Sequence, residues 1–274
     1  EQMIVWLTCT YGRYKCLQRN LKCYLDQDYE GSSVMYICNT GLSLRLPDNF
    51  ELPSNKKIYI DNVPADKFTS TGEKFSYAVG RVQELFPEAT VITHADDDDI
   101  FLPWYVQQAV DKIDEVGKDA WKPQKSLFAT KEKIELVQNI MEASVIVKMN
   151  RIREIGFRSD LTGYEGLSWY TKLRDEWQLE ENNTDYVPSY CFNWSDPQEI
   201  AGHKQSGDID NPDNFNNHKI ASVDHAKAPL TPISKEELDE FYKPYYEWLR
   251  ANKHQLNQEY YRMYFEPIPY AWHR

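Results

Sequence analysis

Short apolar runs alternate with amphipathic segments through the first hundred residues, and this alternation restricts the fold more than any other feature. Leu17, Leu21 and Leu25 recur every four residues between polar neighbours, which is the spacing of one helix face. Strands alternating with such helices predict an α/β fold, with a mainly parallel, mixed sheet flanked by helices. The apolar runs, all rich in β-branched or aromatic residues, span residues 3–8, 34–38, 57–61 and 90–94.

The same patterns predict further elements along the chain. One amphipathic helix covers residues 75–85, and another begins near Pro103 and ends near Gly117. Residues 144–148 form another short apolar run, and a short helix is expected to follow it and end at Gly156. The strand and helix alternation is therefore expected to continue past the middle of the chain.

The C-terminal segment has a different character, rich in Tyr, Trp and Glu. Ser234-Lys235-Glu236-Glu237 fits a capping box, which marks the start of a helix. Pro244 is expected to break that helix, because proline lacks the backbone N–H and clashes with the preceding turn. We therefore predict one large domain over residues 1–232 and a helical C-terminal extension over residues 233–274.

Four consecutive aspartates, Asp96 to Asp99, directly follow the apolar run at residues 90–94. We call these four residues the acid run. Such a cluster repels itself unless a cation lies in it, and Mg²⁺ and Mn²⁺ prefer carboxylate oxygens. Ligands of α/β sheets bind at the carboxyl ends of the strands. The acid run therefore predicts a metal–diphosphate site, and the alternative is a solvated acidic turn or a charge cluster at a helix N-terminus.

Composition excludes several classes of protein. The formal net charge of −12 argues against a surface that binds polyanions broadly, and the 41% hydrophobic content argues against disorder. No apolar run approaches the roughly 18–20 residues of a membrane span, so we expect none. The five cysteines, an odd number with no CxxC pair, favour a reducing, cytoplasmic location.

Three stretches of the chain resemble one enzyme family. Residues 91–103 are similar to the strand, D-x-D-D motif and proline of family-2-like glycosyltransferases with the GT-A fold. Residues 5–13, with Gln27-Asp28-Tyr29 downstream, resemble the first strand, T-x-x-R turn and helix of that family. Residues 144–148, with Gly163-Tyr164-Glu165 further on, resemble its acceptor-side strand and acidic motif. Three landmarks in the expected order are more specific than a D-x-D motif alone.

This resemblance covers residues 3–207 and implies a fold, a reaction and a cofactor. The implied fold is GT-A (Rossmann-like), with a nucleotide-sugar half over residues 1–103 and an acceptor half over residues 104–232. The implied reaction moves a sugar from a nucleotide-sugar donor, with UDP as the expected nucleotide, to an acceptor hydroxyl. The implied cofactor is Mn²⁺ or Mg²⁺.

The family motifs assign the metal ligands. Asp98 is the first choice for the metal, and Asp96 is the other acid of the D-x-D motif. Their task would be to hold the cation against the donor diphosphate and to neutralise charge on the leaving group. His203 lies in a stretch that resembles the late H-x-x-S loop of the family, so it is a candidate third ligand. His218 and His225 are its rivals.

Seven residues match positions that border the donor in the family: Thr8, Tyr11, Arg13, Asn39, Lys74, Asp96 and Asp97. Asn39 stands where the family commonly has an aspartate, and this departure leaves the identity of the base open. Lys74 is interpreted either as a cation that meets a phosphate or as an exposed helix lysine.

The resemblance also assigns the acid–base chemistry. Glu165 matches one acid of the E-D motif, which supplies the general base in inverting members. An acceptor hydroxyl must lose its proton as it attacks the anomeric carbon, and a carboxylate accepts it. The alternative for Glu165 is a structural carboxylate. Trp169 and Trp194 are interpreted as stacking surfaces for the acceptor or base, or as ordinary packing residues.

Two other classes of function are weighed against this one. A metal-dependent nucleotidyltransferase or phosphohydrolase also needs clustered acids, but no Gly-rich phosphate loop occurs near the N-terminus. A catalytically inactive sugar-nucleotide binding module has no reason to keep Asp96, Asp98 and Glu165. The acceptor stays open, because a glycan, a small molecule and a hydroxylated nucleic-acid base all fit these patterns.

Overall fold

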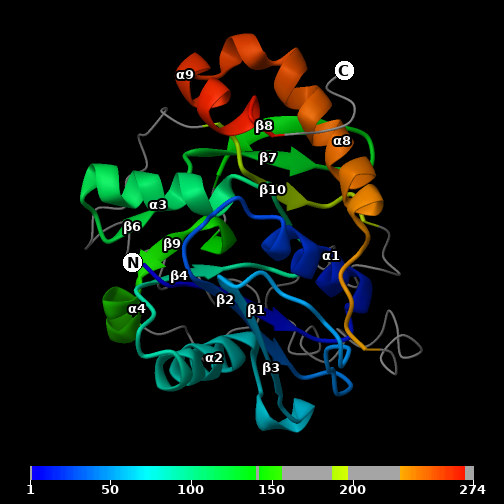
Figure 1. Ribbon diagram of the computed structural model, residues 1–274, viewed down its shortest axis with the longest axis vertical. Coiled ribbons are helices and arrows are strands. Elements are labelled where there is room, and N and C mark those ends of the chain that lie inside the picture. Colours follow the sequence, from blue (N-terminus) through cyan, green and yellow to red (C-terminus); the bar gives the residue numbers. More distant parts are fainter. Residues whose placement is uncertain (1, 140–141, 156–186, 197–228, 269–274) are drawn as a thin grey trace.

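The computed structural model of this chain describes residues 2–139, 142–155, 187–196 and 229–268. At its centre lies a six-stranded sheet with the strand order β3-β2-β1-β4-β9-β6 (Figure 1). Strands β1 to β4 run parallel to one another. At one side β9 pairs antiparallel with β4, and β6 pairs antiparallel with β9, so β6 runs in the same direction as β1 to β4. The strands are β1 Ile4–Thr10, β2 Ser33–Asn39, β3 Lys56–Asn62, β4 Val91–His94, β9 Ile146–Lys148 and β6 Ala120–Trp121.

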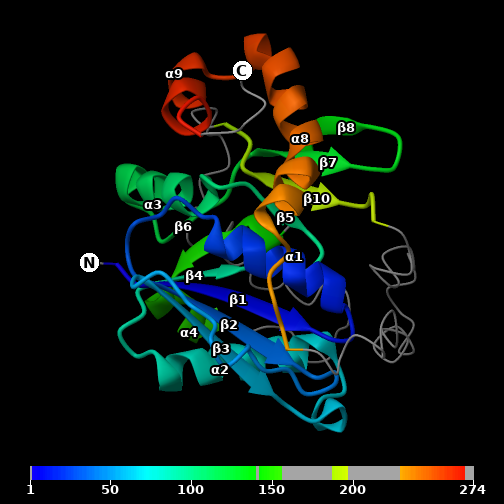
Figure 2. The same cartoon turned by 45° about the vertical axis from the view of Figure 1, so that its right-hand side comes forward.

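Helices cover both faces of this sheet, as the two turned views show (Figures 1 and 2). Along β1, Trp6 belongs to the core on the side of α1 and α3, whereas Leu7 belongs to the core on the side of α2 and α4. This alternation follows from the period of two in a strand. The α/β fold with a mainly parallel, mixed sheet is therefore confirmed. The helices are α1 Tyr14–Leu25, α2 Thr71–Leu85, α3 Tyr105–Val116 and α4 Met149–Ile155, with short 3₁₀ turns at Ala65–Lys67 and Glu142–Ser144.

A second, four-stranded sheet was not predicted from the sequence. Its order is β5-β10-β7-β8, and β5 follows the acid run directly in the chain. Runs this short, paired with strands up to about ninety residues away, carry too little local pattern to be recognised. The strands are β5 Ile100–Phe101, β10 Tyr190–Asn193, β7 Lys125–Ala129 and β8 Ile134–Gln138.

The C-terminal segment begins with α8 Lys235–Ala251, and its capping box at Ser234 and Glu237 is confirmed. The predicted break at Pro244 is wrong, because α8 continues through this residue. Pro244 lies on the exposed side of α8, while buried side chains on either side of it pack into the core with α1 and α3. Tyr242 also donates its hydroxyl to the carbonyl of Phe101 at 3.0 Å. Beyond α8 come a 3₁₀ turn Lys253–Gln255, α9 Gln258–Tyr260 and a π-helical turn Tyr261–Phe265.

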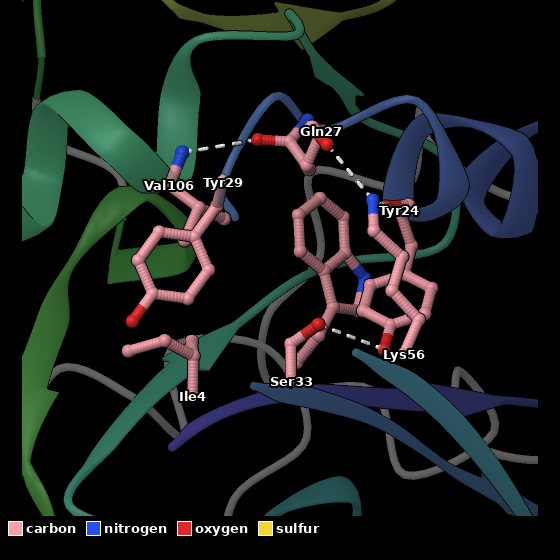
Figure 3. Close-up of a pocket in the computed structure, with 8 residues that line it drawn as sticks. Ile4, Tyr24, Gln27, Tyr29, Ser33, Lys56 and Val106 are labelled. Carbon is pink, nitrogen blue, oxygen red and sulfur yellow. Dashed lines mark hydrogen bonds between the residues drawn. The ribbon is translucent and has the colours of Figure 1, made fainter. Parts of the chain in front are cut away.

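A buried lysine ties the end of α1 to the start of β3. The Lys56 ammonium donates to the carbonyls of Tyr24 at 3.2 Å, Leu25 at 2.8 Å and Gln27 at 2.8 Å. Figure 3 shows this side chain beside a cavity of about 10 Å³, which is too small for a substrate. The last carbonyls of a helix have no partner within the helix, so Lys56 completes the C-terminus of α1.

We expect Lys56→Met to lower the free energy of unfolding by about 2–4 kcal/mol, because the carbonyls of Leu25 and Gln27 lose their lysine donor. Lys57 is exposed and next to it in sequence, so Lys57→Met should change the free energy by less than about 0.5 kcal/mol. Urea denaturation followed by circular dichroism measures both values. Equal losses in the two variants would contradict this role for Lys56.

Candidate functional site

The carboxyl ends of β1, β2 and β4 meet at one edge of the six-stranded sheet. The parallel registers align Thr10 with Asn39 and Leu7 with His94. The chain passes from His94 into the acid run, and α1 begins four residues after β1 ends. The acid run after β4 and the first loop, between β1 and α1, therefore lie together, as expected at the carboxyl edge of a parallel sheet.

Asp97 and Asp98 share one cation, the guanidinium of Arg13. Arg13 Nη2 lies 2.6 Å from Asp97 Oδ1, and Arg13 Nη1 lies 2.5 Å from Asp98 Oδ2. Asp97 is fully buried and also accepts a hydrogen bond from the Thr10 hydroxyl at 2.7 Å. The predicted metal ligand Asp98 and two predicted donor residues thus form one ionic cluster.

Burial and the neighbouring opposite charges shift the pKa values of Asp97 and Arg13 in opposite directions. Burial raises the pKa of Asp97 to about 6, although the neighbouring Arg13 opposes the rise. Burial by itself lowers the pKa of Arg13, but Asp97 and Asp98 outweigh it, so the pKa of Arg13 is raised overall. Arg13 therefore keeps its charge, and the acid run holds a cation within the protein itself.

Asp96 is the most accessible of these carboxylates, with 33% of its side chain exposed. His94 Nε2 lies 2.8 Å from Asp96 Oδ1, and the His94 ring packs edge-on against Phe75 at 4.1 Å between centroids. The imidazole therefore lies beside one oxygen of Asp96, and the Asp96 side chain stays partly open to solvent.

Asp99 has a structural task. Its two carboxylate oxygens accept the Tyr190 hydroxyl at 2.6 Å and the backbone N–H of Asn193 at 3.0 Å. These contacts attach β10 of the second sheet to the acid run. Nothing in the sequence separates this aspartate from its three neighbours, because its partners lie more than ninety residues away in the chain.

Two side chains of α1 hold the main chain of the acid run. Asn20 Nδ2 donates to the carbonyl of Asp96 at 3.0 Å, and Arg19 Nη2 donates to the carbonyl of Asp98 at 2.9 Å. Arg19 also makes two contacts of 2.8 Å with Asp196, which are the geometry of a bidentate pair. Sequence reasoning missed these residues, because no motif connects α1 with Asp196.

The other predicted donor residues lie on the same edge, but several face inward. The Thr8 hydroxyl is fully buried and donates to the carbonyl of Ala95 at 2.9 Å. Asn39 Nδ2 donates to the Leu42 carbonyl and to Asn62 Oδ1, both at 2.8 Å, so this amide shapes the loop after β2. Tyr11 is half-buried in the first loop.

Lys74 is not an exposed helix lysine, so that interpretation is wrong. Only 4% of the residue is exposed, and its ammonium donates to the Thr10 carbonyl at 2.6 Å and to the Thr40 hydroxyl at 2.8 Å. Burial lowers the pKa of Lys74. The side chain reaches from α2 to the loops after β1 and β2, and therefore joins the two loops behind the acid run.

Asp96 and Asp98 offer carboxylate oxygens, the kind of ligand that a hard divalent cation prefers, and Arg13 supplies positive charge to the same cluster. Among the described residues, no three His, Cys, Asp or Glu side chains gather as a complete metal site. His203, His218, His225, Glu165 and Trp169 lie outside the described residues.

No protein-family model and no curated protein sequence matches this chain. Among solved structures, its fold is similar to that of S. aureus TarS 1-349 in complex with UDP-GlcNAc, with a TM-score of 0.51 and 13% identity over 92% of this chain and 74% of that chain. The complex of the same protein with UDP has a TM-score of 0.49 at 12% identity, with the same coverage. A longer TarS structure has a TM-score of 0.48, and the match covers 38% of its length.

The chain thus has a GT-A-like fold, in agreement with the family resemblance of its motifs. At 13% identity the similarity concerns the fold alone. In the described part of the chain, every helix is too short or too polar to cross a membrane.

Proposed function

We propose that this chain is a metal-dependent glycosyltransferase that moves a sugar from a UDP-sugar donor to an acceptor hydroxyl. The observation that carries the proposal is the position of the acid run. It lies at the carboxyl end of β4, in the middle of a GT-A-like sheet, where Asp97 and Asp98 both contact the guanidinium of Arg13. The crystallised complex of TarS with UDP-GlcNAc supports a UDP-sugar as the donor class.

Each residue of the site has a task in this proposal. Asp96 and Asp98 would hold Mn²⁺ or Mg²⁺, which when bound supplies positive charge for the departing diphosphate. Tyr11 and Arg13 would face the donor from the first loop. Behind them Thr8, Asn39 and Lys74 support the loops through the buried hydrogen bonds described above, so their effect on the donor would be indirect.

The acceptor side of the proposal rests on the family motifs. Glu165 would take the proton of the acceptor hydroxyl, and this role implies inversion at the anomeric carbon. His203 would complete the metal ligands.

The test is a donor panel with UDP-glucose, UDP-galactose and UDP-N-acetylglucosamine, each with Mn²⁺, with Mg²⁺ and with EDTA. We expect one donor to release UDP in the presence of a divalent cation and to stop doing so in EDTA. Saccharide and small-molecule acceptors should gain the mass of one sugar residue. EDTA removes the metal reversibly, so added Mn²⁺ should restore turnover.

Three outcomes would overturn the proposal. Release of UMP and sugar phosphate would indicate a phosphohydrolase, because the diphosphate bond rather than the glycosidic bond breaks. In the same assay with UTP and a sugar phosphate in place of the UDP-sugar, consumption of both would indicate a nucleotidyltransferase. Binding of UDP-sugars without turnover of any donor would indicate a binding module.

A further inference from the structure

The acid run already binds a cation, and that cation is a side chain of the same protein. Arg13 contacts carboxylate oxygens of both Asp97 and Asp98 within 2.6 Å. Asp98 is also the carboxylate to which the proposed function assigns the divalent cation. A guanidinium and a dication on one carboxylate would repel each other strongly, since charges a few ångströms apart in a partly buried site are poorly screened.

We infer that Arg13 exchanges partners during donor binding: it neutralises Asp98 in the ligand-free protein and passes to the donor diphosphate when a divalent cation binds Asp98. This inference rests on the proposed function and adds a regulation of the same site. The cation and the diphosphate would then bind together, because each one relieves the cost of binding the other.

The main chain around Asp98 is built to stay in place during such an exchange. The Asp98 carbonyl accepts hydrogen bonds from Arg19 at 2.9 Å and from Asn193 Nδ2 at 3.2 Å. These donors come from α1 and from β10, so the carbonyl is held from two directions. The exchange therefore needs movement of side chains only.

The Arg13 side chain can move away from the carboxylates, whereas Asp97 is held in place. Arg13 is the N-cap residue of α1, follows Gly12 with its positive φ of 67°, and keeps 15% of its side chain exposed. Asp97 is fully buried and retains the Thr10 hydroxyl as a partner. The partial exposure gives the arginine side chain a path toward solvent and toward a ligand.

A diphosphate is the ligand best suited to replace the carboxylates as the partner of Arg13. A guanidinium binds phosphate oxygens through two parallel N–H donors, and its charge does not depend on pH in the physiological range. The N-terminus of the 12-residue helix α1 lies at the same place and also favours a negative charge.

The experiment compares wild type with Arg13→Gln by isothermal titration calorimetry. With Mn²⁺ alone, the variant should bind the cation at least about tenfold more tightly, because a competing cation is gone. With UDP in the presence of saturating Mn²⁺, the variant should bind UDP about tenfold more weakly, because a phosphate partner is gone. If Arg13 has a purely structural role, Arg13→Gln should instead bind both Mn²⁺ and UDP more weakly than wild type.

Two further variants serve as controls. Arg45→Gln removes an arginine with a 66% exposed side chain and should leave both affinities unchanged within about twofold. Arg13→Lys keeps the charge but loses the planar fork of two nitrogens that contacts both carboxylates, so its Mn²⁺ affinity should lie between those of wild type and Arg13→Gln. Arg13→Lys also supplies the comparison if Arg13→Gln does not fold by circular dichroism.

The results separate this inference from the proposed function. If wild type binds Mn²⁺ and UDP together but Arg13→Gln binds Mn²⁺ alone no more tightly than wild type does, the exchange is wrong and the proposed function stands. If wild type binds neither Mn²⁺ nor UDP, the proposed function fails and this inference fails with it.

Discussion

Replacing Asp98 by asparagine is expected to lower kcat/KM for UDP-sugar turnover by about a thousandfold or more. The substitution keeps the size of the side chain but removes one of two carboxylates proposed to hold the divalent cation. A thousandfold loss corresponds to about 4 kcal/mol of transition-state stabilisation, the order that a removed electrostatic contact to the leaving group typically costs. Steady-state kinetics with the donor identified in the panel measures the loss.

The fold should survive this change. The Asp98 carbonyl keeps its hydrogen bonds from Arg19 and Asn193, because they do not involve the replaced carboxylate. A matched control is Asp48→Asn, since the Asp48 side chain is 94% exposed and its ion pair with Arg45 is on the surface. Wild-type activity in Asp98→Asn, at unchanged Mn²⁺ dependence, would falsify the assignment of Asp98 as a metal ligand.

The largest effect on stability is expected from Arg19→Ala, which should lower the free energy of unfolding by about 3–5 kcal/mol. Arg19 and Asp196 each keep only 8% of their side chains exposed. Removing the arginine leaves the Asp196 carboxylate buried without its bidentate partner, and the Asp98 carbonyl also loses a donor. The guanidinium further lies 4.5 Å from the ring centroid of Phe241, so its contact with α8 is lost as well.

An exposed ion pair provides the comparison for Arg19. Arg45 and Asp48 have side chains that are 66% and 94% exposed, and their closest contact is 3.4 Å. Arg45→Ala should therefore change the free energy of unfolding by less than about 1 kcal/mol. Urea denaturation at constant salt measures both variants. A loss below about 1 kcal/mol in Arg19→Ala would show that Asp196 finds solvent or another partner, contrary to the structure.

Much of the central sheet could be predicted because its signals are local. The apolar run at residues 34–38 became β2, and the helix predicted to end near Gly117 does so with this glycine in the left-handed conformation at φ 63°. The acid run was expected at a strand end and lies there. These features depend on periodicity and on the conformational preferences of single residues, which a short stretch of sequence contains.

Other features depended on distant partners and were missed or wrong. The second sheet pairs β10 with β5 and β7, which are separated from it by more than sixty residues. Pro244 does not end α8, because the burial of Tyr242, Tyr245 and Tyr246 holds the helix on both sides of the proline. Lys74 has the helical position that was predicted, but only the packed structure places its ammonium between two loops.

By itself, the sequence determined the kind of fold and the edge of the sheet where the carboxylates gather, because strand and helix periods are properties of neighbouring residues. The tertiary structure alone decided which charges meet there. Arg13 pairs with Asp98 across 85 positions of the chain, and Arg19 pairs with Asp196 across 177. A buried charge takes the partner that the fold brings within reach, and no local pattern specifies that partner.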